Sequence, residues 1–145
     1  MKNTLIIFLI SFLLVCCSKS AESFFEEGEE KFELHKYEAA ISSYSEAIRI
    51  NPKFADAYRR RGHSKSRIGK HKEAIIDFEL ALKNNPNDYR PLFRKAFSLY
   101  ILNQHDKAIF EINKLLSINP KYSKAYVLRA AVYYGNYSAP IQMYQ

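Results

Sequence analysis

Three Asn-Pro pairs recur along the chain at a fixed spacing, and this spacing constrains the fold more than any other feature. The prolines are Pro52, Pro86 and Pro120, and 34 residues separate each from the next. A period of this length is typical of a solenoid, in which one small supersecondary unit stacks on copies of itself. The spacing therefore predicts a repeat architecture, and stacks of this kind present extended binding surfaces.

Alignment on the prolines divides the chain into three units and a partial fourth. They span residues 21–54, 55–88 and 89–122, followed by 123–145. We number the positions of each unit so that the proline is position 32. Small residues then recur at positions 8 and 20, and a larger apolar residue recurs at position 24. Position 8 holds Gly28, Gly62, Ala96 and Ala130, position 20 holds Ala40, Ala74 and Ala108, and position 24 holds Tyr44, Phe78 and Ile112.

The pattern predicts two helices in each unit, over about positions 2–14 and about positions 18–30. Apolar residues at positions 20, 21, 24, 27 and 28 share one face of the second helix. The small residues at positions 8 and 20 let the two helix backbones approach closely, and the larger residue at position 24 fills the space beside them. Asparagine tolerates a left-handed cap and proline disfavours helix in the preceding residue, so we expect each Asn-Pro pair to end the second helix.

The chain resembles the tetratricopeptide repeat family from Ala21 to the C-terminus. The resemblance implies an all-α fold, a right-handed α-solenoid of antiparallel helix hairpins with three complete units and a C-terminal capping helix. The middle unit carries most of the family motif, at Tyr58, Gly62, Ile68-Gly69, Ala74, Phe78, Ala81 and Pro86.

Position 7 departs from the family pattern, in which it is apolar. It holds Glu27, Arg61, Lys95 and Arg129. We therefore expect the aliphatic stems of these side chains to cover apolar surface while their charged groups reach water.

The partial fourth unit, residues 123–145, differs from the other three. Gly135 comes two positions earlier in this unit than Gly69 does in the middle unit. Terminal repeats are often atypical because they cap the stack. We therefore expect a capping helix over residues 123–134 followed by a weakly ordered tail. A kinked second helix that begins near Pro140 is the alternative.

The N-terminus resembles the signal of a bacterial lipoprotein. An apolar run over residues 5–15 follows Met1-Lys2 and leads to Cys16-Cys17. The run is shorter than the roughly 20 residues that span a bilayer, and it fits the apolar region of a signal peptide. An ordinary secretory signal and an uncleaved anchor are the alternatives.

Residues 14–17 (Leu-Val-Cys-Cys) resemble a lipobox, in which cleavage precedes a cysteine that then receives a lipid. Cys17 is the better acceptor, because it places the small Cys16 before the cleaved bond. The resemblance implies a signal peptide over residues 1–16, a tether over residues 17–22 and a lipid-anchored location in the bacterial cell envelope. Both cysteines lie in this region, so we expect no disulfide in the repeats.

No sequence motif points to catalysis, a cofactor or a bound metal. The chain has no Gly-rich phosphate loop, no nucleophile elbow and no paired-histidine zinc signature. His71 and His105 share position 17, where we expect them to fill gaps between helices. The chain is therefore interpreted as a binding protein and not as an enzyme.

Charge is distributed unevenly along the chain, which carries a net charge of +7. Residues 21–50 contain eight acidic and three basic residues, whereas residues 51–129 contain seventeen basic and seven acidic residues. A charged outer face that keeps the helices in solution is one explanation for the basic stretch. Nucleic acid is not expected as a partner of an exported protein.

The resemblance implies that the first helices line a concave groove that receives peptides. Carried onto this sequence, the groove positions include Phe32 and Glu33 of the first unit. The residues expected to bind the peptide are Arg59, Arg60, His63, Arg67, Arg90, Phe93, Arg94, Phe97, Tyr100 and Lys124. Arginine binds carboxylates through two parallel hydrogen bonds, and aromatic rings form apolar pockets. We therefore expect a protein partner with a short segment that carries an acidic side chain or a free C-terminal carboxylate.

Some family members hold a C-terminal dicarboxylate with a Lys/Asn/Asn/Lys/Arg set. The first two of those positions hold Phe25 and Glu29 here, and the other three hold Arg60, Arg90 and Arg94. That ligand is therefore not predicted. A partial carboxylate site at the three arginines is the hypothesis that the sequence retains.

Two other functions are open at this point. The basic middle units could bind anionic lipid or a cell-wall polymer. An apolar end face at the fourth unit could pair with a second copy, giving a homodimer that serves as a structural subunit of an envelope assembly complex.

Overall fold

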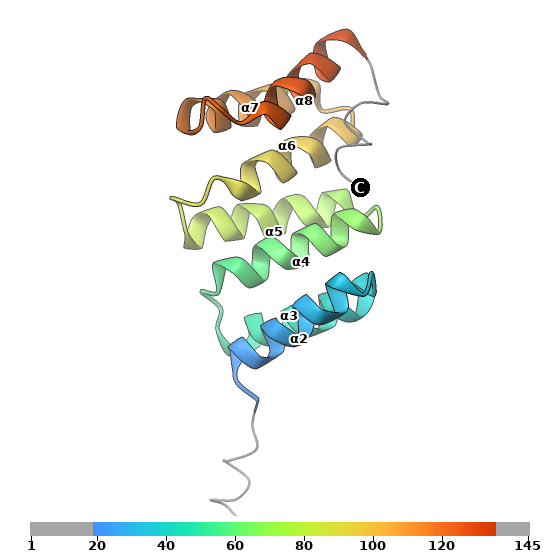
Figure 1. Ribbon diagram of the computed structural model, residues 1–145, viewed down its shortest axis with the longest axis vertical. Helices are drawn as coiled ribbons and strands as arrows, with labels where there is room; N and C mark the ends of the chain where they lie inside the picture. The colour runs from blue at the N-terminus through green and yellow to red at the C-terminus, as the bar shows by residue number, and fades with distance from the viewer. Residues whose placement is uncertain (1–18, 136–145) are drawn as a thin grey trace, which may run out of the picture.

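Residues 19–135 are described by the computed structural model and form seven stacked α-helices with no strand among them (Figure 1). The predicted all-α repeat fold is confirmed. The helices are α2 (Ala21–Glu33), α3 (Tyr37–Ile50), α4 (Ala55–Arg67), α5 (His71–Asn84), α6 (Arg90–Ile101), α7 (His105–Ile118) and α8 (Ser123–Tyr134). Each begins and ends within one residue of the expected bounds.

Some of the predictions concern segments at or beyond the limits of the described range. The signal peptide, Cys17 and the tail from residue 136 lie outside the described residues. Ala21 and Glu22 belong to the first turn of α2, so the tether predicted over residues 17–22 extends too far. Ser20 caps this helix, and its hydroxyl accepts a hydrogen bond from the backbone N–H of Ser23. None of the helices in residues 19–135 has the length and apolar character that crossing a membrane requires.

The helices pair into hairpins that stack in chain order (Figure 1). The hairpins are α2/α3, α4/α5 and α6/α7, and α8 packs against α7 as the first helix of a fourth. The second helix of each hairpin packs on the first helix of the next. The first helices α4, α6 and α8 also contact one another in sequence. One side of the stack is therefore built from first helices.

A left-handed residue at position 15 ends the first helix of each complete hairpin. These residues are His35, Gly69 and Asn103, with φ of 58°, 78° and 56°. Glycine adopts this conformation without strain, and asparagine and histidine tolerate it better than most residues do. Gly135 (φ 65°) ends α8 in the same conformation but comes earlier in its unit, which is why this helix stops after Tyr134.

The Asn-Pro pairs end the second helices as predicted, but in a different conformation. Asn51 has φ −124° and ψ 91°, which is extended and not left-handed, and Asn85 and Asn119 are similar. The proline ring excludes a helical conformation in the residue before it, so the chain leaves the helix at once. The side-chain oxygen of Asn51 then accepts a hydrogen bond from the N–H of Lys53, at 3.1 Å.

The small residues at position 8 lie against the larger residues at position 24, as predicted. A Cβ atom added to Gly28 would lie 2.5 Å from the ring of Tyr44, and one added to Gly62 would lie 2.9 Å from the ring of Phe78. Both rings are completely buried. In the third hairpin position 8 is alanine, and the residue at position 24 is the smaller Ile112. Glycine therefore accompanies an aromatic ring, and alanine accompanies an aliphatic side chain.

Two of the three basic residues at position 7, Arg61 and Lys95, form ion pairs within the chain instead of extending their charges into water, which corrects the prediction for these two residues. The Arg61 guanidinium donates to both carboxylate oxygens of Asp77, at 3.0 and 2.7 Å. The Lys95 ammonium lies 2.8 Å from the Glu111 carboxylate. Both acids occupy position 23 of the same unit, on the second helix. Because the Asp77 side chain is only 1 % exposed, its charge requires such a partner.

The same basic side chains also reach position 25 of the preceding unit. Arg61 donates to Ser45 at 3.1 Å, Lys95 pairs with Glu79 at 2.9 Å, and Arg129 donates to Asn113 at 3.0 Å. We call this series of contacts the position-7 ladder. It joins each hairpin after the first to the hairpin before it.

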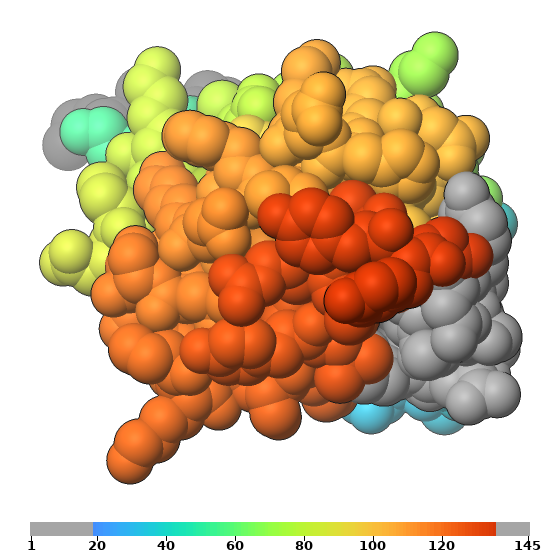
Figure 2. Space-filling view, turned by 90° about the horizontal axis from the view of Figure 1, so that it is seen from above, coloured from blue at the N-terminus to red at the C-terminus, as the bar shows by residue number. Residues whose placement is uncertain are grey.

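The C-terminal end of the stack is closed by α8, as Figure 2 shows in a view onto that end. Ala125, Leu128 and Ala131 are buried against the third hairpin. The side chains of Tyr126, Tyr133 and Tyr134 are exposed in this helix. The last described helix thus buries one face only.

Gly28→Ala is expected to destabilise the chain by about 1–3 kcal/mol, because the added methyl group would overlap the ring of Tyr44. At an unconstrained helical position the same change stabilises a helix by about 1 kcal/mol. Urea unfolding followed by circular dichroism measures the free-energy difference.

Tyr44→Ile supplies the matched control for this change, because it copies the Ala96–Ile112 pair of the third hairpin. In the Tyr44→Ile background, Gly28→Ala should cost little. An equal loss of stability in both backgrounds would contradict the packing argument.

Candidate functional site

The first helices of the hairpins line a groove with a volume of about 490 Å³. Residues of α2, α4, α6 and α8 contribute, together with His35 and Tyr122 from the turns and Tyr37 at the start of α3. The groove residues are Phe32, Glu33, His35, Tyr37, Arg59, His63, Arg67, Arg90, Phe93, Arg94, Tyr122 and Lys124. Five of these side chains are basic and one is acidic, so the groove favours an anionic ligand.

Two of the groove arginines are paired with acidic side chains of the chain itself. Arg59 lies 2.6 Å from a carboxylate oxygen of Asp56, and Arg90 lies 2.7 Å from one of Asp88. A guanidinium nitrogen of Arg59 also lies 3.7 Å from a carboxylate oxygen of Asp88, and one of Arg90 lies 3.2 Å from a carboxylate oxygen of Asp56. The four side chains therefore form one cluster of ion pairs. Burial alone would raise the pKa of Asp88, but the hydrogen bonds from Arg90 outweigh it and hold this pKa below its usual value. A ligand carboxylate would compete with these acids.

Arg60 binds within the chain as well. Its guanidinium forms an ion pair with the carboxylate of Glu29, and the Tyr44 hydroxyl donates to the same carboxylate. The guanidinium also lies 4.7 Å from the centre of the Phe32 ring. Burial lowers the pKa of Arg60, but the hydrogen bonds and charge of Glu29 outweigh this effect and raise it overall. Arg60 therefore connects α4 to α2 and is not among the residues that line the groove.

His63 occupies the floor of the groove as a neutral ring. Its side chain is buried, and its ring centre lies 4.7 Å from that of Phe32. Burial and, to a smaller extent, the positive charges of nearby arginines, first among them Arg94, together lower the pKa of His63 to about 2. A histidine with this pKa carries no charge at neutral pH. It offers the groove an apolar surface and not a cation.

Basic side chains and aromatic rings both contribute to the walls of the groove. The guanidinium of Arg67 is 5.3 Å from the centre of the Tyr37 ring. The ring of Phe93 packs against that of Tyr122, with centres 5.3 Å apart. Lys124 is exposed at the start of α8. Positive charge and flat apolar surface therefore alternate along the groove.

The structure brings together seven of the ten groove residues that were predicted. Arg59, His63, Arg67, Arg90, Phe93, Arg94 and Lys124 line the groove, whereas Arg60, Phe97 and Tyr100 do not. Phe97 and Tyr100 are only 4 % and 1 % exposed, which corrects their assignment. Leu128 and Ala131 of α8 belong to the same buried cluster as Phe97 and Tyr100, so α8 covers this region of α6.

Sequence reasoning missed His35, Tyr37 and Tyr122 as groove residues. They come from the turns between helices and from the start of α3, which a pattern based on the first helices does not include. Phe32 and Glu33 occupy positions 12 and 13 of α2, which are groove positions implied by the family resemblance, and both line the groove.

The histidines at position 17 lie between helices. The Nδ1 atom of His71 is 3.3 Å from the hydroxyl oxygen of Ser98 in the next hairpin, and the ring of His105 packs near that of Tyr100. Within residues 19–135, no three His, Cys, Asp or Glu side chains are placed to hold a metal ion.

Comparison with known families finds matches along most of the described chain. A family model described as "TPR repeat" matches residues 28–69, and one described as "Tetratricopeptide repeat" matches residues 55–88 and 89–122. No curated protein sequence matches the chain.

Solved structures with a similar fold include three that the chain matches over most of its length. The first TPR of Spaghetti (RPAP3), bound to the HSP90 peptide SRMEEVD, has a TM-score of 0.78 and 21% identity, over 80% of this chain and 92% of that one. MamA has a TM-score of 0.79 and 22% identity, over 86% and 73%. The yeast Sti1 TPR2B domain in complex with pHsp70 has a TM-score of 0.75 and 24% identity, over 80% and 98%. At these identities the likeness is one of fold.

The depressed pKa of His63 predicts that stability falls as the pH is lowered from 7 to 5. The native state keeps this histidine neutral, whereas the unfolded chain takes up a proton below its ordinary pKa of 6.5. The unfolded state therefore binds more protons, which costs up to about 1.4 kcal/mol per pH unit in the free energy of unfolding. Urea unfolding at several pH values measures the slope.

His63→Gln should flatten this slope, whatever it does to stability at pH 7. Burial also lowers the pKa of His71, so a second change, His71→Gln, should remove some of the slope that remains. Glu27, whose pKa is lowered to about 2 by hydrogen bonds from Lys19 and Lys31, contributes only below pH 5. An unchanged slope in His63→Gln would show that His63 takes up a proton as readily in the folded chain as in the unfolded chain, which would contradict the lowered pKa.

Proposed function

The chain belongs to the tetratricopeptide repeat family, and on this basis we propose that it is a non-catalytic interaction scaffold whose groove binds a short acidic segment of a partner protein. The observation that carries the proposal is the composition of the groove, in which five basic side chains and one acidic side chain accompany four aromatic rings. Basic side chains attract carboxylates, and the rings supply rigid apolar contact area. The peptide SRMEEVD bound to Spaghetti (RPAP3) is an acidic segment of this kind.

The groove residues divide into two sets under this proposal. Arg67, Arg94 and Lys124 supply positive charge, while Phe93 and Tyr122 supply a site for an apolar side chain. Arg59 and Arg90 are already bound to acids and serve mainly to hold α4 and α6 in register. Phe93 and Arg94 belong to α6, and Tyr122 and Lys124 lie at the start of α8, so the proposed segment binds at this end of the groove.

The ion pairs of α4 argue against the alternative of a basic patch for anionic lipid or polymer. The three consecutive arginines of α4 pair with Asp56, Glu29 and Asp77 respectively. Their charges are therefore largely balanced within the chain. An acidic peptide in the groove is favoured, because a short peptide needs fewer unbalanced basic side chains on the protein than a lipid surface or a polymer does.

The scaffold is proposed to be anchored to the bacterial envelope by a lipid on Cys17. The lipobox-like residues 14–17 support this location. Because α2 begins at Ala21, only three residues separate the lipidated cysteine from the first helical residue. The repeats would therefore act within a short distance of the membrane surface.

Seven-residue peptides that differ in their number of acidic residues test the ligand class. Acidic peptides should bind more tightly than their amide counterparts, and the dissociation constant should rise with salt. Arg94→Gln and Lys124→Ala should each weaken the binding of the acidic peptides, the first by tenfold or more, which corresponds to about 1.4 kcal/mol. Fluorescence anisotropy measures these constants.

Lys83→Ala is the matched control, because Lys83 is an exposed basic residue of α5 that does not line the groove. It should leave the affinity unchanged. If Lys83→Ala weakened binding as much as Arg94→Gln, or if acidic and amide peptides bound alike, the groove would not be the site.

Intact-mass analysis of the membrane-extracted protein tests the anchor. The mass should show loss of residues 1–16 and added acyl groups, and Cys17→Ser should abolish both changes. Cys16→Ser is the matched control, since serine is also small at the residue before the cleaved bond, and it should be processed normally. An intact Met1 in the unmodified chain would contradict the proposed anchor.

A further inference from the structure

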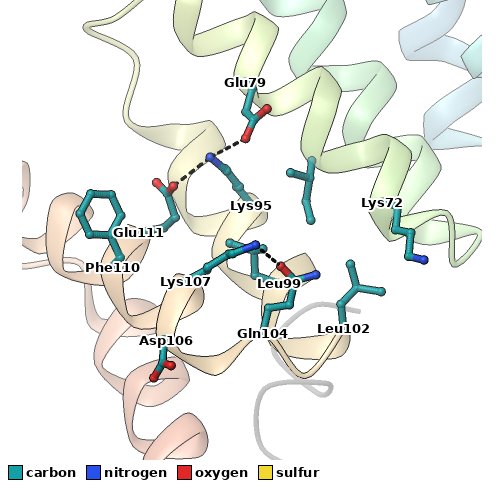
Figure 3. Close-up of a pocket in the computed structure, with 11 residues that line it drawn as sticks. Lys72, Glu79, Lys95, Leu99, Leu102, Gln104, Asp106, Lys107, Phe110 and Glu111 are labelled. Atoms are coloured by element: carbon teal, nitrogen blue, oxygen red, sulfur yellow. Dashed lines mark hydrogen bonds and ion pairs between the residues drawn. The ribbon is translucent and has the colours of Figure 1, made fainter.

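A second pocket lies away from the groove, between α5, α6 and α7 (Figure 3). Its volume is about 480 Å³, which is within the range of pockets that bind small molecules. Its lining includes Ile75, Leu99, Leu102 and Phe110, and it shares no residue with the groove. We call it the outer pocket.

The outer pocket exists because two positions differ between the middle unit and the third unit. At position 11 the middle unit has Lys65, whose ammonium lies 2.9 Å from Asp77 and 3.8 Å from Glu73 at position 19. In the third unit these positions hold Leu99 and Lys107. In the middle unit the Lys65 side chain therefore extends across the surface between α4 and α5. In the third unit the shorter Leu99 leaves the corresponding space beside α6 and α7 open and apolar.

The charges around the outer pocket are arranged unevenly. On one side Lys95 lies between Glu79 and Glu111, at 2.9 and 2.8 Å, so these acids are bound within the position-7 ladder (Figure 3). Lys72 and Lys107 are exposed, and neither forms an ion pair with residues 19–135. Among residues 19–135, the Lys107 ammonium donates to the Gln104 side-chain oxygen, at 3.0 Å.

A neighbouring hollow extends the pocket at its basic side. It shares Lys72 and Leu102 with the outer pocket and adds Lys70 at the turn before α5. Glu73 also lies there, but it is the acid that approaches Lys65. The carboxylate of Asp106 points away from the centre of the outer pocket in Figure 3. The open end of the apolar floor is therefore bordered by lysines.

We propose that the outer pocket binds a small amphipathic carboxylate, an aliphatic chain with one negative charge, of which a free fatty acid is the simplest example. The chain lies on Leu99, Leu102 and Ile75 beneath the exposed ring of Phe110, and the carboxylate reaches Lys72 and Lys107. Apolar burial supplies the affinity, and the lysines select the charge. This site is independent of the peptide proposed for the groove.

Octanoate is the probe for this ligand class, with octylamine and octanol as partners of equal chain length. The chain from Ser18 to Gln145, which keeps every described helix and the whole core, is titrated below the critical micelle concentration and followed by backbone amide NMR. Octanoate should bind saturably, with shifts confined to α5, α6 and α7 around the pocket. Octylamine should bind at least tenfold more weakly.

The first variants change exposed residues, so the test does not depend on whether a variant with a substitution in the core still folds. The double change Lys72→Ala with Lys107→Ala should weaken octanoate at least fivefold and leave octanol unchanged. Phe110→Ala should weaken both ligands. Ile76→Ala is the matched control, because Ile76 occupies the same position of the preceding unit, is exposed, and does not line the pocket.

Leu99→Lys reproduces the arrangement of the middle unit and should abolish octanoate binding by filling the pocket. Three results would each overturn the proposal: shifts that do not saturate, equal affinity for octanoate and octylamine, or shifts centred on groove residues such as Arg94. Unchanged octanoate affinity in the double lysine variant would do the same.

Discussion

The close approach of the two helices in each hairpin is the contact on which the rest of the structure depends. Gly28 and Gly62 bring the first helix against the rings of Tyr44 and Phe78, with no room for a methyl group at Gly28. Because the rings are fully buried, this contact fixes both the distance between the helices and their rotation. Only at that distance do the position-7 side chains meet acids on the second helix. The groove depends on it as well, since the rotation of each first helix decides which residues face their neighbours.

The position-7 ladder adds polar specificity to a stack that is otherwise held by apolar packing. Apolar contacts alone tolerate small slips of one hairpin over another, whereas an ion pair with a buried carboxylate such as Asp77 does not. Arg61 and Lys95 each bind both their own hairpin and the preceding one. The hairpins are therefore fixed in register by charge, while their stability comes mainly from burial. This division leaves the groove free to differ in chemistry from one unit to the next.

The repeat period and the helix bounds could be read from the sequence because they follow from short-range rules. The Asn-Pro pair ends a helix whatever lies around it, and small residues at positions 8 and 20 have one simple explanation. Depth of burial was harder to predict, since it depends on what covers a position. His63 and Phe97 share position 9, yet only His63 lines the groove, because α8 extends over that region of α6. The ladder was missed for a related reason: partners sixteen residues away become neighbours only after the hairpin has folded.

The position-7 ladder also determines which of these repeat units can be duplicated in tandem. In a tandem duplication of residues 55–88, Arg61 of the second copy would face Glu79 of the first, the same partner that Lys95 has now. Two copies of the middle unit could therefore stack on each other with this ion pair in place. A duplicated first unit would lack this ion pair, because it has Glu27 at position 7 and Ser45 at position 25. A longer array derived from this chain would therefore repeat the middle unit and keep the acidic hairpin α2/α3 as its first hairpin.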